Sequence, residues 1–146
     1  MTNNITQNLE INRNWIHLND FQRNIDLSFF NHDNYKKDIQ SLDKKMSDIL
    51  CDDSWMGHCA KYQLNSGGKR FRAVLALLAS KIFGLNVKVS HDIAICCEFI
   101  HNASLIHDDL QDRDLLRRGL PTIWNRFGDH TAINLGDLFI SASFET

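Results

Sequence analysis

Several features that mark particular classes of protein are missing from this sequence. It contains a single proline, Pro121, and no low-complexity linker, so long stretches are free to be helical. No segment approaches the roughly 20 consecutive apolar residues that cross a bilayer. The first residues, MTNNITQNLEINRN, lack the basic and apolar regions of a secretory signal. The sequence therefore predicts a cytoplasmic protein without a transmembrane segment.

Charge and cysteine spacing exclude further classes. The formal net charge is −2, so the chain as a whole attracts neither nucleic acid nor an anionic membrane. No C-x-x-C pair occurs, and no histidine pairs with a cysteine at zinc-like spacing. We interpret the four cysteines as reduced thiols in a reducing compartment: Cys51, Cys59, Cys96 and Cys97.

Helical periodicity runs through most of the 146 residues, which fit a single domain with one core. Residues 1–34 are rich in asparagine and predict either a partly ordered arm or a segment that packs on the main body or on a second subunit. Residues 35–146 show no persistent strand alternation. The predicted fold class is all-α, a bundle of helices joined by short loops.

The predicted helices follow from apolar spacing and capping residues. They cover residues 35–50, 55–62, 73–83, 90–112 and 129 to the end. Asp53 or Ser54 can cap the second of these, and Ser90 can cap the long central helix. The last helical pattern reaches Thr146 without a closing glycine or proline, so it predicts an interrupted helix.

Charge gathers in one stretch, His101–Gly119, which reads HNASLIHDDLQDRDLLRRG. Asp108 and Asp112 lie four residues apart, so on a helix they face the same way and repel each other. Two carboxylates with room for water suit Mg²⁺, which completes its coordination with waters and substrate phosphate. Arg117 and Arg118 carry forked donors suited to phosphate oxygens. This combination predicts a diphosphate site, whereas the alternative is a solvated helix end whose charges pair with one another.

A second charged block, GGKRFRA at Gly67–Ala73, places cations at the start of a predicted helix. Cations there oppose the helix dipole. A bound anion would relieve that conflict, because a glycine turn, free backbone N–H groups and basic side chains meet at one place. The alternative is a basic solvated loop.

Three blocks in this order resemble the trans-isoprenyl diphosphate synthases, the polyprenyl synthetase family. HNASLIHDDLQD followed by LLRRGLPTIW resembles the first aspartate-rich motif of that family, and GGKRFRA resembles its GGKR-x-RP signature. The stretch FGDHTAINLGDLFISASFE is similar to the GD-x-x-A-x-x-x-GD helix that follows. The resemblance covers roughly Gly67 to the C-terminus. It implies a helical bundle like the N-terminal part of the isoprenoid synthase fold, with residues 35–146 as a partial synthase domain.

The resemblance implies a transferase of isoprenoid biosynthesis that joins isopentenyl diphosphate to an allylic diphosphate after Mg²⁺-assisted ionisation. It assigns Asp108 and Asp112 to Mg²⁺, Asp109 to an assisting role, and Arg117 to the allylic diphosphate. It assigns the diphosphate of isopentenyl diphosphate to Lys69, Arg72, His101 and Arg118. His101 lies about two helical turns before Asp108, so two adjoining anion sites are consistent with one helix face.

By the same resemblance, Ala103 and Ser104 occupy the positions that limit product length, where short-chain relatives carry a bulky aromatic residue. Small residues there leave room for a longer tail. We therefore expect a product longer than farnesyl, and we expect replacement of Ala103 by Phe to shorten it.

The chain departs from the family pattern in one respect that should matter little and in one that matters much more. The signature proline after Arg72 is Ala73, and the second aspartate-rich motif of the family has no counterpart here. The chain could be part of a prenyltransferase completed by other sequence, a non-catalytic subunit or remnant paired with an intact synthase, or an unrelated metal-binding helical module. Intact acidic and basic residues favour the first hypothesis. Uncovered apolar helix faces would favour a homodimer or pairing with a completing subunit.

Overall fold

The computed structural model describes residues 32–146, so the predicted arm lies, through residue 31, outside the described residues. In the described part, six helices and one two-stranded hairpin follow one another. In chain order they are α2 (His32–Leu50), α3 (Trp55–Asn65), α4 (Phe71–Ile82), α5 (Val87–Asp112), β1 (Leu116–Arg117), β2 (Leu120–Pro121), α6 (Ile123–Phe127) and α7 (Asp129–Ser143). The all-α prediction is confirmed for these residues, and the short hairpin is an addition to it.

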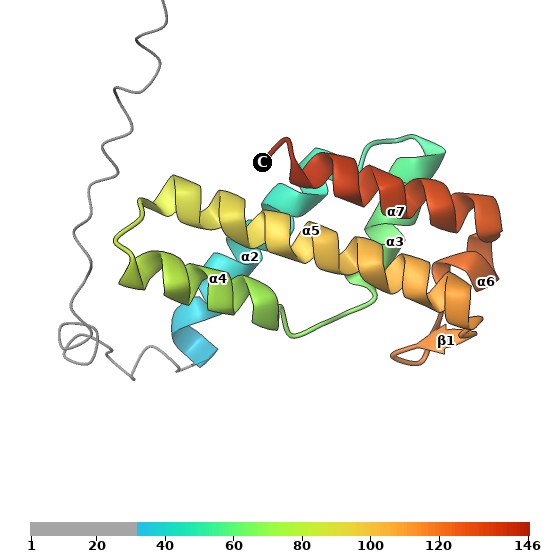
Figure 1. Cartoon of the computed structure of the whole chain (residues 1–146), viewed down its shortest axis with the longest axis horizontal. Coiled ribbons are helices and arrows are strands. Elements are labelled where there is room, and N and C mark those ends of the chain that lie inside the picture. The colour runs from blue at the N-terminus through green and yellow to red at the C-terminus, as the bar shows by residue number, and fades with distance from the viewer. Residues whose placement is uncertain (1–31) are drawn as a thin grey trace, which may run out of the picture.

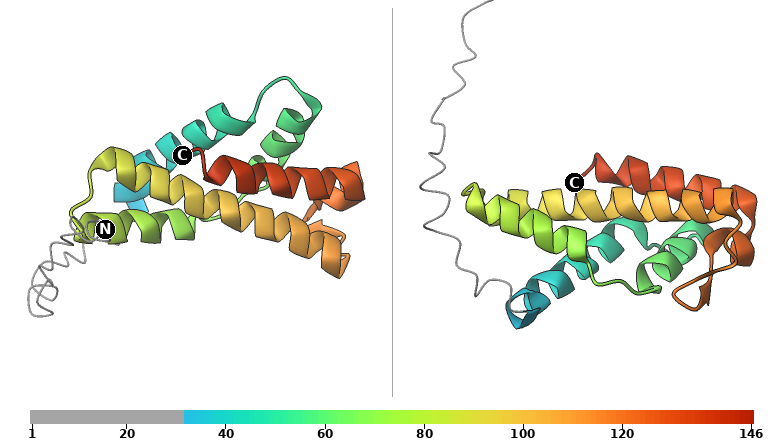
Figure 2. Two further views of the ribbon diagram at one scale, coloured as in Figure 1. Left: turned by 45° about the horizontal axis from the view of Figure 1, so that its top comes forward. Right: turned by 60° about the horizontal axis from the view of Figure 1, so that its bottom comes forward.

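Helix α5 lies in the middle of this arrangement. Figure 1 shows it between α4 and α7, which run along opposite sides of it. Helices α2 and α3 lie against this layer from one side, as the right-hand view of Figure 2 shows. The 26 residues of α5 span about 39 Å. One rigid element therefore connects the α4–α5 turn to the hairpin.

The core forms where these helices meet, and α5 supplies much of it. Phe99 of α5 is fully buried and packs edge to face on Phe139 of α7, with ring centroids 5.6 Å apart. Met46 of α2 is buried in the same core cluster. One side of α5 stays open, because Ile93 and Ile100 are 38% and 49% exposed. This helix is therefore packed on several sides and uncovered on one.

Two helix starts test the predicted caps. Ser54 caps α3 as predicted, since its side chain accepts a hydrogen bond from the Gly57 N–H (3.0 Å). The prediction of Ser90 as the cap of α5 is wrong. Asn86 caps this helix instead, because its side chain accepts from the Val89 N–H (2.9 Å). Ser90 lies inside the first turn, where its hydroxyl donates to the Asn86 carbonyl (2.8 Å).

The bounds of two other helices also differ from prediction. Helix α4 begins at Phe71, two residues earlier than predicted, so Arg72 lies in its first turn and Arg70 takes the N-cap position. Helix α7 was predicted to continue to the end of the sequence. It ends at Ser143, where the Phe144 N–H turns back to the Ser141 carbonyl (3.1 Å).

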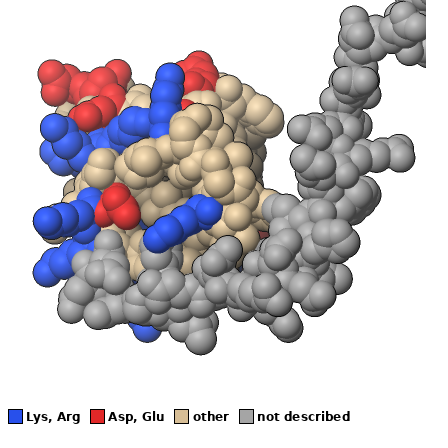
Figure 3. All heavy atoms as spheres, turned by 90° about the vertical axis from the view of Figure 1, so that its left-hand side faces the viewer, with Lys and Arg blue, Asp and Glu red and all other residues tan. Residues whose placement is uncertain are grey.

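The two ends of α5 differ in surface chemistry. Figure 3 shows the end at which α4 turns into α5, where uncharged residues fill the middle of the face and Lys and Arg side chains border it. The exposed large apolar side chains of this turn are Ile82, Phe83, Leu85, Val87 and Val89. The opposite end carries the aspartates of the motif and the hairpin. Within residues 32–146, every helix is too short or too polar to span a bilayer.

Candidate active site

Five basic residues line one pocket, and apart from Arg70, whose side chain turns inward, they come from three parts of the fold. Lys69 precedes α4, Arg72 lies in its first turn, His101 lies in the middle of α5, and Arg118 lies at the tip of the hairpin. These are the residues that the resemblance assigned to a single diphosphate. The fold brings them together although they are far apart in sequence, and their charges suit a multiply charged anion.

The turn before α4 uses backbone conformations that glycine adopts easily. Gly67 and Gly68 have φ angles of +89° and +143°, and Arg70 has φ of +48°. A Cβ on Gly68 would lie 2.8 Å from Arg118 Nη1. The missing side chain therefore lets the Arg118 guanidinium lie against the backbone of the turn, and this contact joins the start of α4 to the hairpin.

The hairpin presents Arg118 through a strained turn. Strands β1 and β2 pair antiparallel with Arg117 opposite Leu120, which leaves Arg118 and Gly119 as the two turn residues. Both have positive φ, +54° and +80°, as a type I′ turn requires. The left-handed conformation costs a non-glycine residue about 1 to 2 kcal/mol, and such strain concentrates at functional positions. The hairpin thus fixes the position of Arg118 beside the start of α4.

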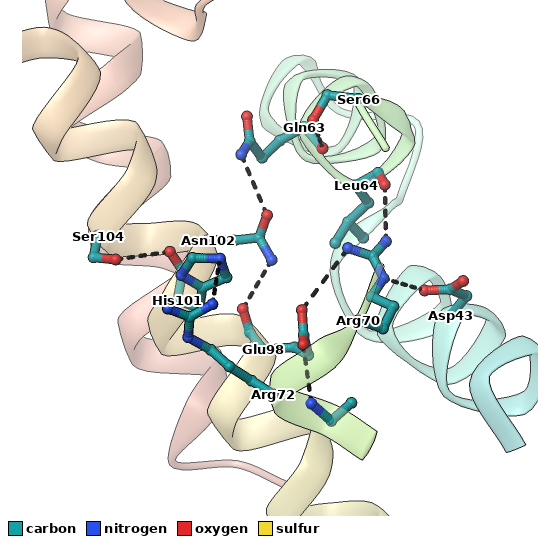
Figure 4. A network of polar contacts seen from close by, with 11 residues as sticks. Asp43, Gln63, Leu64, Ser66, Arg70, Arg72, Glu98, His101, Asn102 and Ser104 are labelled. Carbon is teal, nitrogen blue, oxygen red and sulfur yellow. Dashed lines mark hydrogen bonds and ion pairs between the residues drawn. The ribbon is translucent and has the colours of Figure 1, made fainter. Parts of the chain in front are cut away.

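His101 meets Arg72 in this pocket. Arg72 Nη1 and His101 Nε2 are 3.2 Å apart, and Figure 4 shows the two side chains facing each other. Burial lowers the pKa of His101 below its ordinary value, and the neighbouring arginines, Arg72 first, lower it further. The neutral ring accepts a hydrogen bond from Arg72. An anion bound between them would raise the pKa and turn His101 into a second donor.

Asp108 and Asp112 lie one turn apart near the end of α5. Both are exposed, and neither makes a hydrogen bond or an ion pair within residues 32–146. In the part of the chain that the structure describes, no third carboxylate, imidazole or thiol joins them to form a metal cluster. Two exposed carboxylates suit Mg²⁺, which binds through one or two carboxylates and keeps several waters for substrate phosphate.

Asp109 points away from these two carboxylates. It is 3% exposed, and its two oxygens accept hydrogen bonds from Arg117 Nε at 2.8 and 2.9 Å, with Arg117 Nη2 as a further donor. The bond with Asp109 raises the pKa of Arg117 above its ordinary value. The resemblance gave Asp109 an assisting role beside Asp108 and Asp112. Each helical step rotates by about 100°, so consecutive aspartates face different surroundings. Arg117 Nη1 makes no bond to a described residue and stays available to an anion.

His107, directly before Asp108, packs on α7. A Cβ on Gly136 would collide with the His107 ring, and His107 Nε2 lies 3.3 Å from the Ile133 carbonyl oxygen. The same nitrogen is 3.8 Å from Asp137 Oδ1. Gly136 therefore lets α5 and α7 approach closely at the level of the exposed aspartates.

An open groove runs between α4 and α5 and meets the cation pocket. Its lining residues are Arg72, Leu75, Ala76, Cys97, Ile100, His101 and Ser104. Ser104 is exposed on its floor, and its hydroxyl donates to the His101 carbonyl (2.8 Å). Ala103 is 2% exposed and belongs to the core. Of the two predicted chain-length residues, only Ser104 borders the groove.

Buried polar residues beneath the cation pocket were not predicted from the sequence (Figure 4). Arg70 reaches inward to Asp43 and to Glu98. Asn102 donates to the Glu98 carbonyl (2.8 Å) and accepts from Gln63 Nε2 (3.2 Å). The one available signal was an isolated acidic residue, Glu98, in an otherwise apolar part of the central helix, because a buried charge requires a partner.

A family model described as polyprenyl synthetase matches residues 53–146. The chain belongs to the polyprenyl synthetase family. The match starts upstream of Gly67, where the resemblance of the motifs began, so it also includes α3. The cation pocket, the exposed aspartates and the hairpin all lie within the matched residues of this polyprenyl synthetase chain.

Similar proteins in this family carry the names of prenyl diphosphate synthases. The chain is 40% identical over 86 residues to the geranylgeranyl diphosphate synthase of Methanosarcina mazei, which covers 59% of this chain and 26% of that protein. It is 44% identical over 87 residues to a heterodimeric geranylgeranyl pyrophosphate synthase large subunit of Arabidopsis thaliana, which covers 58% and 24%. The structure of heptaprenyl diphosphate synthase from Staphylococcus aureus matches with a TM-score of 0.70 and 29% identity, over 79% of this chain and 36% of that one. The fold is that of isoprenoid synthases, as predicted, and the matched part spans 24 to 36% of these proteins.

Proposed function

We propose that this chain binds the diphosphate groups in a trans-prenyltransferase, an enzyme that joins isopentenyl diphosphate to an allylic diphosphate. The convergence of Lys69, Arg72, His101 and Arg118 on one pocket carries this proposal, and exposed Asp108 lies on the same helix as His101. The names of the similar proteins in M. mazei and S. aureus, geranylgeranyl and heptaprenyl diphosphate synthase, support the same substrate class. Such charged diphosphates dissolve in water, and we place their condensation in the cytoplasm.

The cation pocket is the proposed site for the diphosphate of isopentenyl diphosphate. Arg72 and Arg118 offer planar forks of donors that match phosphate oxygens, and Lys69 adds a point charge. The backbone N–H groups of Phe71 and Arg72 donate to no group within residues 32–146. They lie at the positive end of the α4 dipole, so they favour the same anion.

Asp108 and Asp112 are the proposed ligands for Mg²⁺, because both carboxylates are exposed and unpaired among the described residues. Bound Mg²⁺ would neutralise the charge that develops on the leaving allylic diphosphate. Arg117 would add a hydrogen bond through Nη1, while its other donors hold Asp109. We therefore propose that Asp109 assists by orienting Arg117, and that it is not itself a ligand.

The proposed reaction breaks the C–O bond of the allylic diphosphate, and the bonding electrons leave with the diphosphate. The double bond of isopentenyl diphosphate then attacks the allylic cation and forms a C–C bond, after which the adduct loses a proton. Fixed cations stabilise the charge of the leaving group. Apolar side chains of the groove, among them Leu75 and Ile100, would keep water from the cation once the groove is covered.

The groove beyond Ser104 is the proposed path of the growing prenyl tail. Small and apolar side chains line it, and the hydroxyl of Ser104 stays bonded to the helix backbone, so it leaves space on the groove floor. We propose a product longer than farnesyl. A Ser104→Phe variant of the catalytically active assembly should release shorter products, and an unchanged product length would contradict this path.

We further propose that protein outside residues 32–146 completes the site, as a continuation of the chain, a second copy or a completing subunit. Among the described residues, no third metal ligand joins Asp108 and Asp112, and the groove between α4 and α5 is open to solvent. Both observations support this proposal. The A. thaliana relative is named as one subunit of a heterodimer. A non-catalytic subunit paired with an intact synthase is the second candidate. This second candidate also accounts for the open groove, because the partner would cover it. The intact cation pocket favours the first candidate, a catalytic chain.

Calorimetric titration with isopentenyl diphosphate tests the cation pocket. We expect the purified chain to bind it and Arg72→Gln to weaken binding about tenfold or more, because a charge-assisted hydrogen bond is lost. The matched control is Arg126→Gln. Arg126 is exposed and lies outside the pocket, where its guanidinium carbon is 4.4 Å from the centroid of the Tyr62 ring. This variant should bind like the wild type. A folded chain that binds no isopentenyl diphosphate would overturn the proposal.

A turnover assay with Mg²⁺, isopentenyl diphosphate and farnesyl diphosphate then separates the two candidates. Product that disappears in the Asp108→Ala, Asp112→Ala double variant would assign catalysis to this chain. Binding without turnover would make the chain the diphosphate-binding part of a larger assembly, and addition of an intact family member would show whether it regulates that enzyme.

A further inference from the structure

Glu98 is a buried acidic residue at the floor of the cation pocket. It is 3% exposed, yet it lies among residues that line a site for anions. A negative charge in such a place opposes the binding of diphosphate by simple electrostatics. The contacts of Glu98 with the start of α4 and with Arg70 indicate a structural role at this place.

Helix α4 has no cap of its own, and Glu98 supplies one from α5. The N-cap position of α4 is Arg70, whose side chain makes no capping hydrogen bond. Glu98 Oε1 accepts a hydrogen bond from the Ala73 N–H at 3.0 Å. Ala73 is the third residue of the helix, and its N–H is one that a capping side chain normally satisfies. The start of α4 is therefore held by a residue of the neighbouring helix.

Glu98 also helps to turn one cation of the basic block away from the pocket. Arg70 Nε donates to Asp43 Oδ1 at 2.7 Å, and Arg70 Nη2 donates to the Leu64 carbonyl at 2.9 Å. Arg70 Nη1 lies 3.9 Å from Glu98 Oε2. The Arg70 side chain is only 10% exposed, whereas the flanking Lys69 and Arg72 are exposed.

We propose that Glu98 is a positioning residue for the diphosphate site: it fixes the first turn of α4 through Ala73 and holds Arg70 inward, so that Lys69 and Arg72 face the anion. This inference rests on the proposed function of the cation pocket. The arrangement explains why a basic run contains one buried and two exposed members. It also explains how Arg72 reaches His101, because Arg72 directly precedes the residue that Glu98 holds.

A second effect of Glu98 distinguishes it from an ordinary buried group. Its carboxylate lies one turn before His101 on α5 and favours the charged imidazole, in opposition to burial and the arginines. Neutralising Glu98 should therefore lower the pKa of His101 further. This pKa reports the direct electrostatic effect of the carboxylate on His101, separately from its hydrogen bond to the start of α4.

The experiment compares three variants with the wild-type chain. Glu98→Ala removes the cap and the charge, while Glu98→Gln keeps an oxygen for the Ala73 N–H and removes only the charge. The matched control is Gln63→Ala, which deletes a buried hydrogen bond from α3 to Asn102 without touching α4. Calorimetry with inorganic diphosphate gives the dissociation constant, thermal unfolding gives Tm, and NMR titration gives the pKa of His101.

We expect Glu98→Ala to weaken diphosphate binding about tenfold, because one buried charged hydrogen-bond partner is lost. Glu98→Gln should weaken it less: it keeps the bond to the Ala73 N–H and removes a charge that repels the anion, but it frees Arg70 from its ion pair and so loosens the turn. Gln63→Ala should lower Tm and bind within about twofold of the wild type. Glu98→Gln should also lower the pKa of His101.

Equal binding by folded Glu98→Gln and wild type, with an unchanged pKa of His101, would overturn the inference, even if Glu98→Ala does not fold. The loss of binding in Arg72→Gln serves as the internal reference. If Arg72→Gln binds diphosphate normally, the proposed pocket itself is wrong. If only the Glu98 variants bind normally, the pocket stands and Glu98 does not position it.

Discussion

The two anion-handling regions of this chain are built in opposite ways. In the cation pocket, Arg72 contacts His101, and Arg70 and Glu98 hold the adjoining turn through buried bonds. At the other region, Asp108 and Asp112 are exposed and have no partner among the described residues. The side chains of the cation pocket are therefore held in place before any ligand binds. The two carboxylates are not held by other described side chains, so a ligand would have to fix their positions. Diphosphate binding and metal binding should therefore be separable by mutation.

The sharpest contrast lies within the aspartate motif itself. Asp109→Ala should lower the free energy of unfolding by about 3 kcal/mol, because it leaves the partly buried Arg117 without its carboxylate partner. Asp108→Ala and Asp112→Ala should each change it by less than about 0.5 kcal/mol, as is usual for exposed residues. Urea denaturation of the three variants measures the difference. Similar stabilities for all three would show that Asp109 is not the buried member of the motif.

The two proposed chain-length residues should differ in stability as well. Ala103→Phe forces a ring into a position that is 2% exposed and should lower the free energy of unfolding by about 2 kcal/mol through overpacking. Ser104→Phe extends into the groove and should change it by less than about 0.5 kcal/mol. Denaturation curves of both variants test this. A stable Ala103→Phe protein would mean that Ala103 also opens toward the groove.

Removal of metal should affect the two regions differently. Chelation of Mg²⁺ should weaken the binding of farnesyl diphosphate about tenfold, since its proposed site depends on Asp108 and Asp112, and should leave the binding of isopentenyl diphosphate within about twofold. Calorimetry with and without chelator measures both constants. An equal loss for the two ligands would show that the cation pocket also depends on metal.

The smallest expected effect is a pH dependence of stability from His101. Its pKa is lower in the folded chain than its ordinary value, chiefly through burial. As the pH falls below about 6.5, the unfolded chain binds a proton that the folded chain does not, so stability falls until the folded pKa is reached. His101→Asn should remove this part of the pH dependence. Urea midpoints of both proteins between pH 7.5 and pH 5 should therefore differ in slope, and parallel curves would contradict the lowered pKa.

Much of this arrangement could be predicted because it depends on local pattern. The apolar spacing indicated the central helix, and its motif contained His101 and Asp108 in the correct relative register. The start of this helix was misplaced, since Asn86 and Ser90 are both good caps and only the folded backbone shows that the helix begins after Asn86.

Other features depend on partners that are distant in sequence. The inward course of Arg70 requires Asp43 and the Leu64 carbonyl, and no local rule separates it from the neighbouring cations. The pairing of Asp109 with Arg117 requires the hairpin, whose turn is unusual because a non-glycine residue, Arg118, occupies a left-handed conformation. Sequence patterns therefore identified which residues carry charge but not which of them face inward.

Gly136 of α7 has a consequence beyond packing. Because the His107 ring occupies the space of a missing side chain, the separation of α5 and α7 at this level is set by a direct contact between a ring and a backbone. A side chain at position 136 would have to displace the His107 ring or move the two helices apart beside Asp108. Glycine at this position therefore keeps α7 directly behind the residue that precedes the first exposed aspartate.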